Sequence, residues 1–421
     1  MSPSSYQFIL SLILVTLLNY RNVSCISKSD FPQDFIFGAG SSAYQIEGAA
    51  NLDGKGPNNW DYYTHKYPAT TTWDGSNGDV SADFYHHYKN DIKLMKKIGL
   101  THFRFSISWS RILPKGTKAG GVNQLGIDFY NNVIDELLAN DIQPFVTLFH
   151  WDIPHALEEA YGSFLSNNIV SDFVDFANIC FKEFGDRVKK WVTITKPNTY
   201  AQLAYASGDE VPNRCSHLKS SNTSLDGPRC FGGNSATEPY IVAHNLLLSH
   251  ASVVALYRQK FQASQNGTIG ITVSCNWVEP YDFKPKTVNA TTRYFDHSCG
   301  WFFNPLNFGD YPETMHSLVG NRLPKFTADQ SILLKNSFDF IGLDYYTAFY
   351  IQEDNATTPH YDLDDHAKKT FSDKDGMHLG KKDSIDFYDY PTGLENVTLY
   401  LRENYNNPII IVTKKWIRFS R

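Results

Sequence analysis

The sequence predicts an α/β fold, a (β/α)8 barrel truncated after its seventh strand. Short apolar runs rich in Val, Ile, Phe and Thr recur at long intervals, and segments with helical periodicity lie between them. Several of these runs are apolar on both faces, as strands buried between two layers must be. Because strand and helix alternate with connections long enough for parallel pairing, a barrel is favoured over a sandwich.

Seven apolar runs are expected to form the strands: Phe35–Tyr44, His102–Trp109, Pro144–Trp151, Lys190–Thr195, Ile269–Cys275, Phe338–Thr347 and Ile409–Thr413. Five segments are expected to form helices, because their apolar residues recur at helical spacing: Tyr85–Met95, Ile127–Leu137, Ile169–Phe184, Leu246–Tyr257 and Leu394–Tyr405. Only eight residues follow the seventh run, although such barrels close with eight strands. We therefore expect unpaired edges on strands one and seven, and a marginal or aggregation-prone product.

Composition narrows the class of protein. The chain has 421 residues, of which 42% are hydrophobic and 19% charged, so it belongs with ordinary globular proteins. The net charge is −6 with no long basic run, which gives nucleic acid or an anionic membrane nothing to attract. The aromatic share of 15% is a hint of sugar binding, since Trp and Tyr faces stack on sugar rings. No Cys/His spacing indicates zinc, and we expect no cofactor.

The N-terminus resembles a secretory signal. Residues 1–25 contain an apolar run, Phe8–Leu18, that is too short to span a bilayer. Its start lacks Lys and Arg, and a buried N-terminal helix is the alternative. Residues 26–421 would then form the barrel domain, destined for the extracellular space, the vacuole or the endoplasmic reticulum. N-x-[ST] acceptors agree with this route at Asn222, Asn266, Asn289, Asn355 and Asn396.

The cysteines divide into two groups. Cys215 and Cys230 flank a loop rich in Ser, Asn, Gly and Pro, where a disulfide is easily formed and persists in an oxidising compartment. Cys180, Cys275 and Cys299 sit among apolar residues, and we expect buried free thiols there.

The active site of a barrel lies where its strands end, so the residues at which the runs turn polar are the candidates. These are Gln45, Arg104, His150, Lys196, Tyr346 and Lys414. Six segments around them, DFIFGAGSSAYQIEGA, RFSISWSRILPKG, VTLFHWDIPHALEE, GNSATEPYIVAHNLLLSHA, GDYPETM and DFIGLDYYT, occur in the order found in one family. The chain resembles the plant β-glucosidases of glycoside hydrolase family one.

The resemblance implies a sugar-binding role for several of these residues. Gln45 and His150 would hydrogen-bond the sugar hydroxyls, and Trp151 would line the same pocket. Tyr346 and Arg104 would stand beside the nucleophile, although the Asn that relatives carry two positions before Tyr346 is Asp344 here. Without the resemblance, the favoured interpretation is that Gln45 caps a loop and that His150 is a satisfied core histidine.

The two catalytic motifs are altered. A retaining glycosidase needs two carboxyl groups about 5–5.5 Å apart, one as nucleophile and one as acid/base. The family's T-x-N-E-P reads Thr-Ile-Thr-Lys-Pro at 193–197, which places Lys196 in the acid/base position and Thr195 in that of the sugar-binding Asn. The family's T-E-N-G reads Thr-Lys-Lys-Trp at 413–416, which places Lys414 in the nucleophile position. A protonated lysine has no lone pair to attack a sugar, so we expect an inactive protein.

Three functional hypotheses remain open. The first is an inactive β-glucosidase relative, whose lysines reflect drift in a decaying copy or a selected new role. The second is an active β-glucosidase whose reading frame is shifted near Thr413, because 415–419 read one base later can encode Asn-Gly and a family-like continuation. That correction leaves Lys196 in place. The third is a module that holds a β-glucoside, glucose or a partner without cleaving it. The sequence leaves the aglycone and the oligomeric state open.

Overall fold

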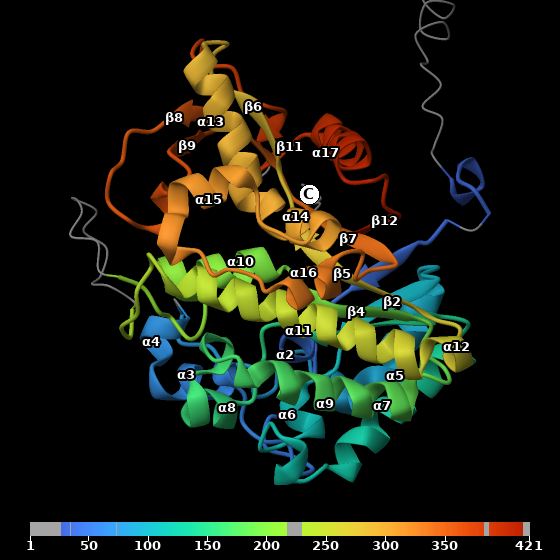
Figure 1. Ribbon diagram of the computed structural model, residues 1–421. Helices are drawn as coiled ribbons and strands as arrows, with labels where there is room; N and C mark the ends of the chain where they lie inside the picture. The colour runs from blue at the N-terminus through green and yellow to red at the C-terminus, as the bar shows by residue number, and fades with distance from the viewer. Residues whose placement is uncertain (1–26, 34, 73, 217–229, 383–386, 416–421) are drawn as a thin grey trace, which may run out of the picture. The chain divides into compact units, whose positions relative to one another are not determined.

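The computed structural model describes residues 27–33, 35–72, 74–216, 230–382 and 387–415 (Figure 1). From Gly38 onward, the described chain is built around seven parallel strands in the order β1-β2-β3-β4-β5-β7-β12. Their bounds are β1 Gly38–Gly40, β2 His102–Ser106, β3 Gln143–Phe149, β4 Lys190–Thr195, β5 Thr268–Ser274, β7 Phe340–Tyr345 and β12 Ile410–Lys415. Every neighbouring pair runs parallel, as the barrel prediction requires.

The five predicted helices are confirmed, and each begins before the predicted residue. They are α5 Phe84–Lys97, α7 Gln124–Ala139, α9 Asn168–Phe184, α11 Glu238–Lys260 and α17 Pro391–Asn404. α11 is long and apolar enough to cross a membrane by length and composition, but 78% of that window is buried. It packs closely against α9, as a core helix does.

Shorter helices and two small sheets lie between these strands and long helices in the chain. The helices are α2 Ala43–Ile46, α3 Asn59–Lys66, α4 Pro68–Thr71, α6 Trp109–Ile112, α8 His155–Tyr161, α10 Pro197–Gln202, α12 Gln262–Gln265, α13 Pro285–Phe295, α14 Trp301–Phe308, α15 Glu313–Val319 and α16 Ala328–Leu334. A second sheet pairs β6 Trp277–Pro280, β8 Ala348–Glu353 and β9 Ala367–Thr370, and a third pairs β10 Lys381–Lys382 with β11 Tyr388–Asp389. Residues 27–37 form a separate small unit with one helical turn, Lys28–Asp30.

The two outer strands of the order differ from the inner ones in burial. All residues of β7 are buried, whereas β1 is exposed throughout and β12 is mostly half-buried, with Val412 45% exposed. This low burial is consistent with the predicted unpaired edges on the first and seventh strands. The truncation after the seventh strand remains a prediction. The expected strand at Phe35–Tyr44 is wrong in extent. Only Gly38–Gly40 is strand, since the Ser42 hydroxyl accepts a hydrogen bond from the Gln45 amide and starts α2.

The disulfide prediction is half right. Cys215 and Cys230 are bonded as predicted, and Cys180 is a buried free thiol. The prediction of free thiols at Cys275 and Cys299 is wrong, because the end of β5 and the turn after α13 bring the two together as a disulfide. An apolar neighbourhood indicates burial and does not distinguish a thiol from a disulfide.

The predicted targeting and modification sites remain predictions. The signal segment 1–25 and Asn222 lie outside the described residues. Of the other acceptors, Asn266, Asn289 and Asn355 are exposed and Asn396 is half-buried.

Candidate active site

The strand ends bring most of the predicted site residues together. Arg104 lies on β2, His150 and Trp151 directly follow β3, and Lys196 directly follows β4. Asp344 and Tyr346 mark the end of β7, and Lys414 lies near the end of β12. These are the carboxyl ends of parallel strands, the face at which barrel enzymes carry their chemistry.

Arg104 connects the strands below the site. It is buried, and its Nη2 donates to the Thr195 hydroxyl while its Nε donates to the Thr147 hydroxyl at 3.1 Å. Its Nη1 lies 3.4 Å from the carbonyl oxygen of Thr413 and 3.8 Å from Asp344 Oδ1. The guanidinium therefore links β3, β4, β7 and β12 and supplies fixed positive charge.

Asp344 is the counter-charge to this guanidinium. Its Oδ1 accepts from the Thr413 hydroxyl at 2.7 Å, and its Oδ2 accepts from the Tyr346 hydroxyl at 3.4 Å. The residue is 1% exposed. A carboxylate so enclosed and so bonded is closed to an incoming sugar and serves to hold Arg104.

Lys196 directly follows β4 and lies beside two aromatic side chains. Its Nζ lies 4.7 Å from the centre of the Trp151 ring and 3.4 Å from the Tyr346 hydroxyl. Burial, together with the charges of Lys414 and Arg104, lowers the pKa of Lys196 to about 8, and Asp344 and Glu210 oppose the shift. The ammonium form still predominates at pH 7.

The backbone around this lysine is strained in the manner of functional sites. Lys196 and Trp151 have φ of 47° and 75°, in the left-handed region that non-glycine residues seldom adopt. The Trp151 indole N–H donates to the carbonyl oxygen of Thr195 at 2.8 Å, which holds the ring beside the lysine.

Lys414 and His150 complete the group. Burial lowers the pKa of the Lys414 ammonium, with Arg104 adding to the shift and Asp344 opposing it. Burial also holds the pKa of His150 well below its usual value, with help from Arg104, Lys196 and Lys414. His150 is therefore a neutral imidazole within electrostatic reach of all three cations, and its buried Nδ1 has no hydrogen-bond partner among the described residues.

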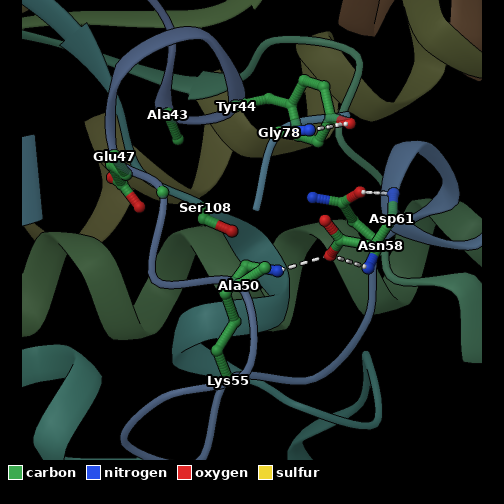
Figure 2. Close-up of a pocket in the computed structure, with 10 residues that line it drawn as sticks. Ala43, Tyr44, Glu47, Ala50, Lys55, Asn58, Asp61, Gly78 and Ser108 are labelled. Carbon is green, nitrogen blue, oxygen red and sulfur yellow. Dashed lines mark hydrogen bonds and ion pairs between the residues drawn. The ribbon is translucent and has the colours of Figure 1, made fainter. Parts of the chain in front are cut away.

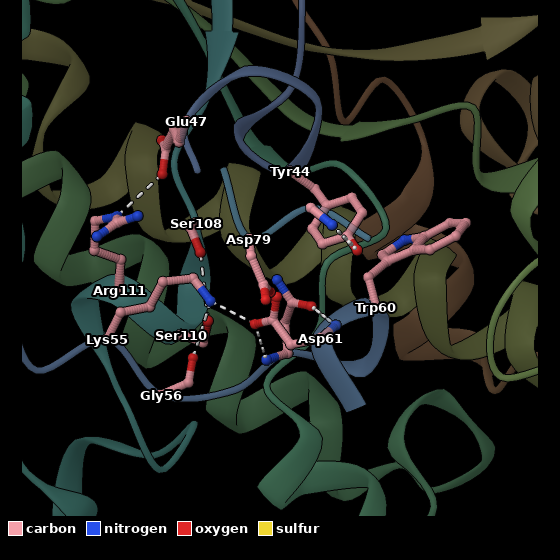
Figure 3. A network of polar contacts seen from close by, with 12 residues as sticks. Tyr44, Glu47, Lys55, Gly56, Trp60, Asp61, Asp79, Ser108, Ser110 and Arg111 are labelled. Atoms are coloured by element: carbon pink, nitrogen blue, oxygen red, sulfur yellow. Dashed lines mark hydrogen bonds and ion pairs between the residues drawn. The ribbon is translucent and has the colours of Figure 1, made fainter. Parts of the chain in front are cut away.

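Gln45 stands apart from this group. It is exposed on α2, and the described residues give its side chain no contact with the other site residues. Glu47, directly after the helix, pairs with Arg111 at 3.0 Å (Figure 3). It also accepts a hydrogen bond from the Tyr130 hydroxyl at 2.6 Å. Gln45 is thus fixed at its backbone while its amide remains free to bind.

A small polar cavity lies behind α2. It is lined by residues that include Tyr44, Glu47, Lys55, Asp61 and Ser108, and its volume is about 10 Å³ (Figure 2). That volume holds about one water molecule and no sugar ring. The cavity therefore belongs to the support of α2, together with the buried Lys55–Asp61 ion pair.

Sequence reasoning missed two residues near the site. Burial raises the pKa of Glu210 to about 7, and Lys196 opposes this shift, so the carboxyl lies within electrostatic reach of the lysine. Asn276 Oδ1 accepts from the backbone amides of Tyr346 and Thr347 at 3.2 Å each and fixes the turn after β7. Glu210 follows the helical turn Leu203–Ser207 and does not stand at the end of a strand, so the search of strand ends did not include it.

Comparison with known proteins decides the family. The profile of glycosyl hydrolase family 1 matches residues 27–419. The chain belongs to glycosyl hydrolase family 1. Arabidopsis thaliana "Beta-glucosidase 17" is 52% identical over 398 residues, which are 94% of this chain and 75% of the relative. Rice "Beta-glucosidase 24" is 49% identical over 396 residues, 93% of this chain and 77% of the relative.

Solved structures of family 1 agree with the fold. A rice Os3BGlu6 β-glucosidase superposes with a TM-score of 0.87 and 42% identity, covering 93% of this chain and 80% of that one. A β-glucosidase of the fungus Humicola insolens, solved in complex with glucose, superposes with a TM-score of 0.86 and 38% identity, covering 91% and 79%. The (β/α)8 barrel class and the kinship with plant β-glucosidases are thereby confirmed.

Proposed function

We propose that this family 1 chain binds β-glucosides or glucose and does not hydrolyse them. The observation that carries the proposal is the pair of ammonium groups, Lys196 and Lys414, at the ends of β4 and β12. The family resemblance assigns these two positions to the acid/base and the nucleophile. A retaining glycosidase forms and then hydrolyses a glycosyl-enzyme intermediate, and these two steps need a nucleophilic carboxylate and an acid/base carboxyl group. This chain has neither group at those positions.

The neighbouring carboxyl groups do not replace the missing ones. Asp344 is 1% exposed and bonded to Thr413 and Arg104, so it is closed to the anomeric carbon. Glu210, with a pKa of about 7, can hold a proton, but a proton donor alone forms no glycosyl intermediate. The cations would also destabilise an oxocarbenium-like transition state, which needs negative charge beside it.

The groups that would contact a sugar are retained. His150 is a neutral imidazole at the end of β3, and Gln45 is exposed on a fixed helix. Trp151 offers an aromatic face at the same strand ends. These groups support ligand binding without chemistry.

The test has a catalytic and a binding arm. The purified chain is incubated with p-nitrophenyl β-glucoside, and the same glucoside and glucose are titrated by calorimetry. We expect phenol release equal to that of heat-denatured protein, together with measurable binding. Turnover above that control refutes the loss of activity, and absence of binding at millimolar ligand refutes the binding role.

The runner-up is an active β-glucosidase whose nucleophile is restored by a corrected reading frame near Thr413. Its basis is the family-like alternative reading of 415–419. Sequencing the transcript across that codon decides between the two: a Glu-Asn-Gly frame supports the runner-up, and Lys-Lys-Trp supports the inactive chain.

A further inference from the structure

The two lysines leave positive charge at the site without a carboxylate partner. Among residues 27–415 that the structure describes, neither Lys196 Nζ nor Lys414 Nζ has a carboxylate oxygen within 4.0 Å. The buried carboxylate of Asp344 is already engaged by Arg104 and Thr413. By contrast, the adjacent Lys415 is paired with Asp389 at 3.1 Å.

One guanidinium contacts the residues that directly precede both lysines, because Arg104 Nη2 donates to the Thr195 hydroxyl and its Nη1 donates to the carbonyl oxygen of Thr413 at 3.4 Å. Lys414 contributes to the lowered pKa of Lys196, and both contribute to that of His150. Three cationic groups, Arg104, Lys196 and Lys414, thus converge on one neutral imidazole. The site has more positive than negative charge, because Asp344 balances one of the three and Glu210 is only partly ionised at neutral pH.

The position of this charge relative to a sugar follows from the family resemblance. The two altered positions are those whose carboxyl groups flank the anomeric carbon in a retaining glycosidase. A ligand seated with its hydroxyls on His150 and Gln45 would therefore bring C1 toward the two ammonium groups. A neutral C1 substituent would leave both half-buried ammonium groups unpaired, which is unfavourable.

We propose that the pocket selects sugars that carry a negatively charged group on C1, such as an aldonate carboxylate or a C1 phosphate. An anionic oxygen placed between Lys196 and Lys414 accepts charge-assisted hydrogen bonds from both. The inference rests on the proposed function, since it needs the sugar-binding side of the pocket, and it specifies the class of ligand. No bond is formed or broken.

The test compares ligands that differ in where the charge lies. Gluconate, glucose 1-phosphate, glucose 6-phosphate, glucose and inorganic phosphate are titrated into the purified chain by calorimetry at pH 7. We expect the two C1 anions to bind at least about tenfold more tightly than glucose, glucose 6-phosphate or inorganic phosphate. The arms with gluconate and glucose 1-phosphate distinguish a carboxylate from a phosphate ligand.

Three variants identify the groups responsible. K196M and K414M are each expected to weaken binding of the preferred C1 anion about tenfold while leaving glucose binding within about twofold. K415M, which removes a lysine already paired with Asp389, is the matched control and should change neither. Circular dichroism and the retained glucose affinity show that the variants are folded.

The outcomes separate this inference from the proposed function. Glucose binding without preference for a C1 anion, or a preference for glucose 6-phosphate, overturns the inference and leaves the proposed sugar pocket standing. Tight binding of inorganic phosphate equal to that of glucose 1-phosphate also overturns it, because no sugar is then recognised. If none of the sugars binds, both the inference and the binding role fail.

Discussion

Replacing Lys196 by methionine should stabilise the fold, and by more at pH 7 than at pH 9.5. Burial, Lys414 and Arg104 lower the pKa of this lysine from 10.5 to about 8. A shift of this size corresponds to roughly 3 kcal/mol of unfavourable free energy for the charged form. Solvent around the half-buried ammonium screens part of this unfavourable free energy, and the variant also loses the favourable contact between Lys196 and Trp151. The net gain in stability of the variant is therefore about 1–2 kcal/mol.

The sign of the pH dependence follows from linkage. Between pH 8 and 10.5 the unfolded chain binds more protons at this lysine than the folded chain, so the stability of the wild type rises with pH in that window. Below pH 8 the full cost of the buried ammonium is present. The methionine variant has no such group, so its advantage is largest at pH 7 and shrinks as pH approaches 10.5.

Equilibrium urea unfolding, followed by tryptophan fluorescence at pH 7 and pH 9.5, measures the difference. K93M, which removes an exposed lysine on α5, is the control and should show no pH-dependent gain. A K196M variant that is less stable than wild type at pH 7, or whose advantage is the same at both pH values, would refute the reasoning about the buried charge.

Three further predictions concern the same site and its support. The double variant K196E/K414E should release p-nitrophenol from an aryl β-glucoside at least about tenfold faster than wild type. Neither single variant should do so, because the two carboxylates act as a unit. A single variant as fast as the double variant would contradict this prediction. Affinity for a C1-anionic sugar should fall about fivefold or more between pH 7 and pH 9 as Lys196 loses its proton near pH 8, and a flat calorimetric profile argues against its contact with the anion. Replacing both Cys275 and Cys299 by alanine opens a loop with a sequence separation of 24 and should cost about 3 kcal/mol of unfolding free energy, so an unchanged urea midpoint would show that this disulfide adds nothing.

Strands were predictable from the sequence where charged residues or proline mark their ends. β4 begins at the charged Lys190 and ends before Lys-Pro at 196–197, and prediction and structure agree on Lys190–Thr195. β1 was overestimated because no charged residue interrupts Phe35–Tyr44, and only the Ser42 cap reveals the helix within it. The sheet of β6, β8 and β9 was missed because strands as short as β6, with four residues, carry little periodicity.

The candidate site was predictable only where a strand ends. His150, Lys196, Tyr346 and Lys414 lie where strands end, Arg104 lies within β2, and their contacts or electrostatic coupling place them together. Glu210 and the Cys275–Cys299 pair depend on how distant loops meet, which no local pattern encodes. The role of Asp344 as the partner of Arg104 likewise appears only once β2 and β7 are in place.

The most direct measurement is intact-mass spectrometry of the chain during incubation with an aryl β-glucoside that has a fast leaving group, with an active family 1 β-glucosidase run alongside. Because ammonium groups stand where both carboxylates are required, we predict no released phenol and no glucosyl adduct on any residue of this chain. A covalent glucosyl adduct formed in step with phenol release would contradict the account.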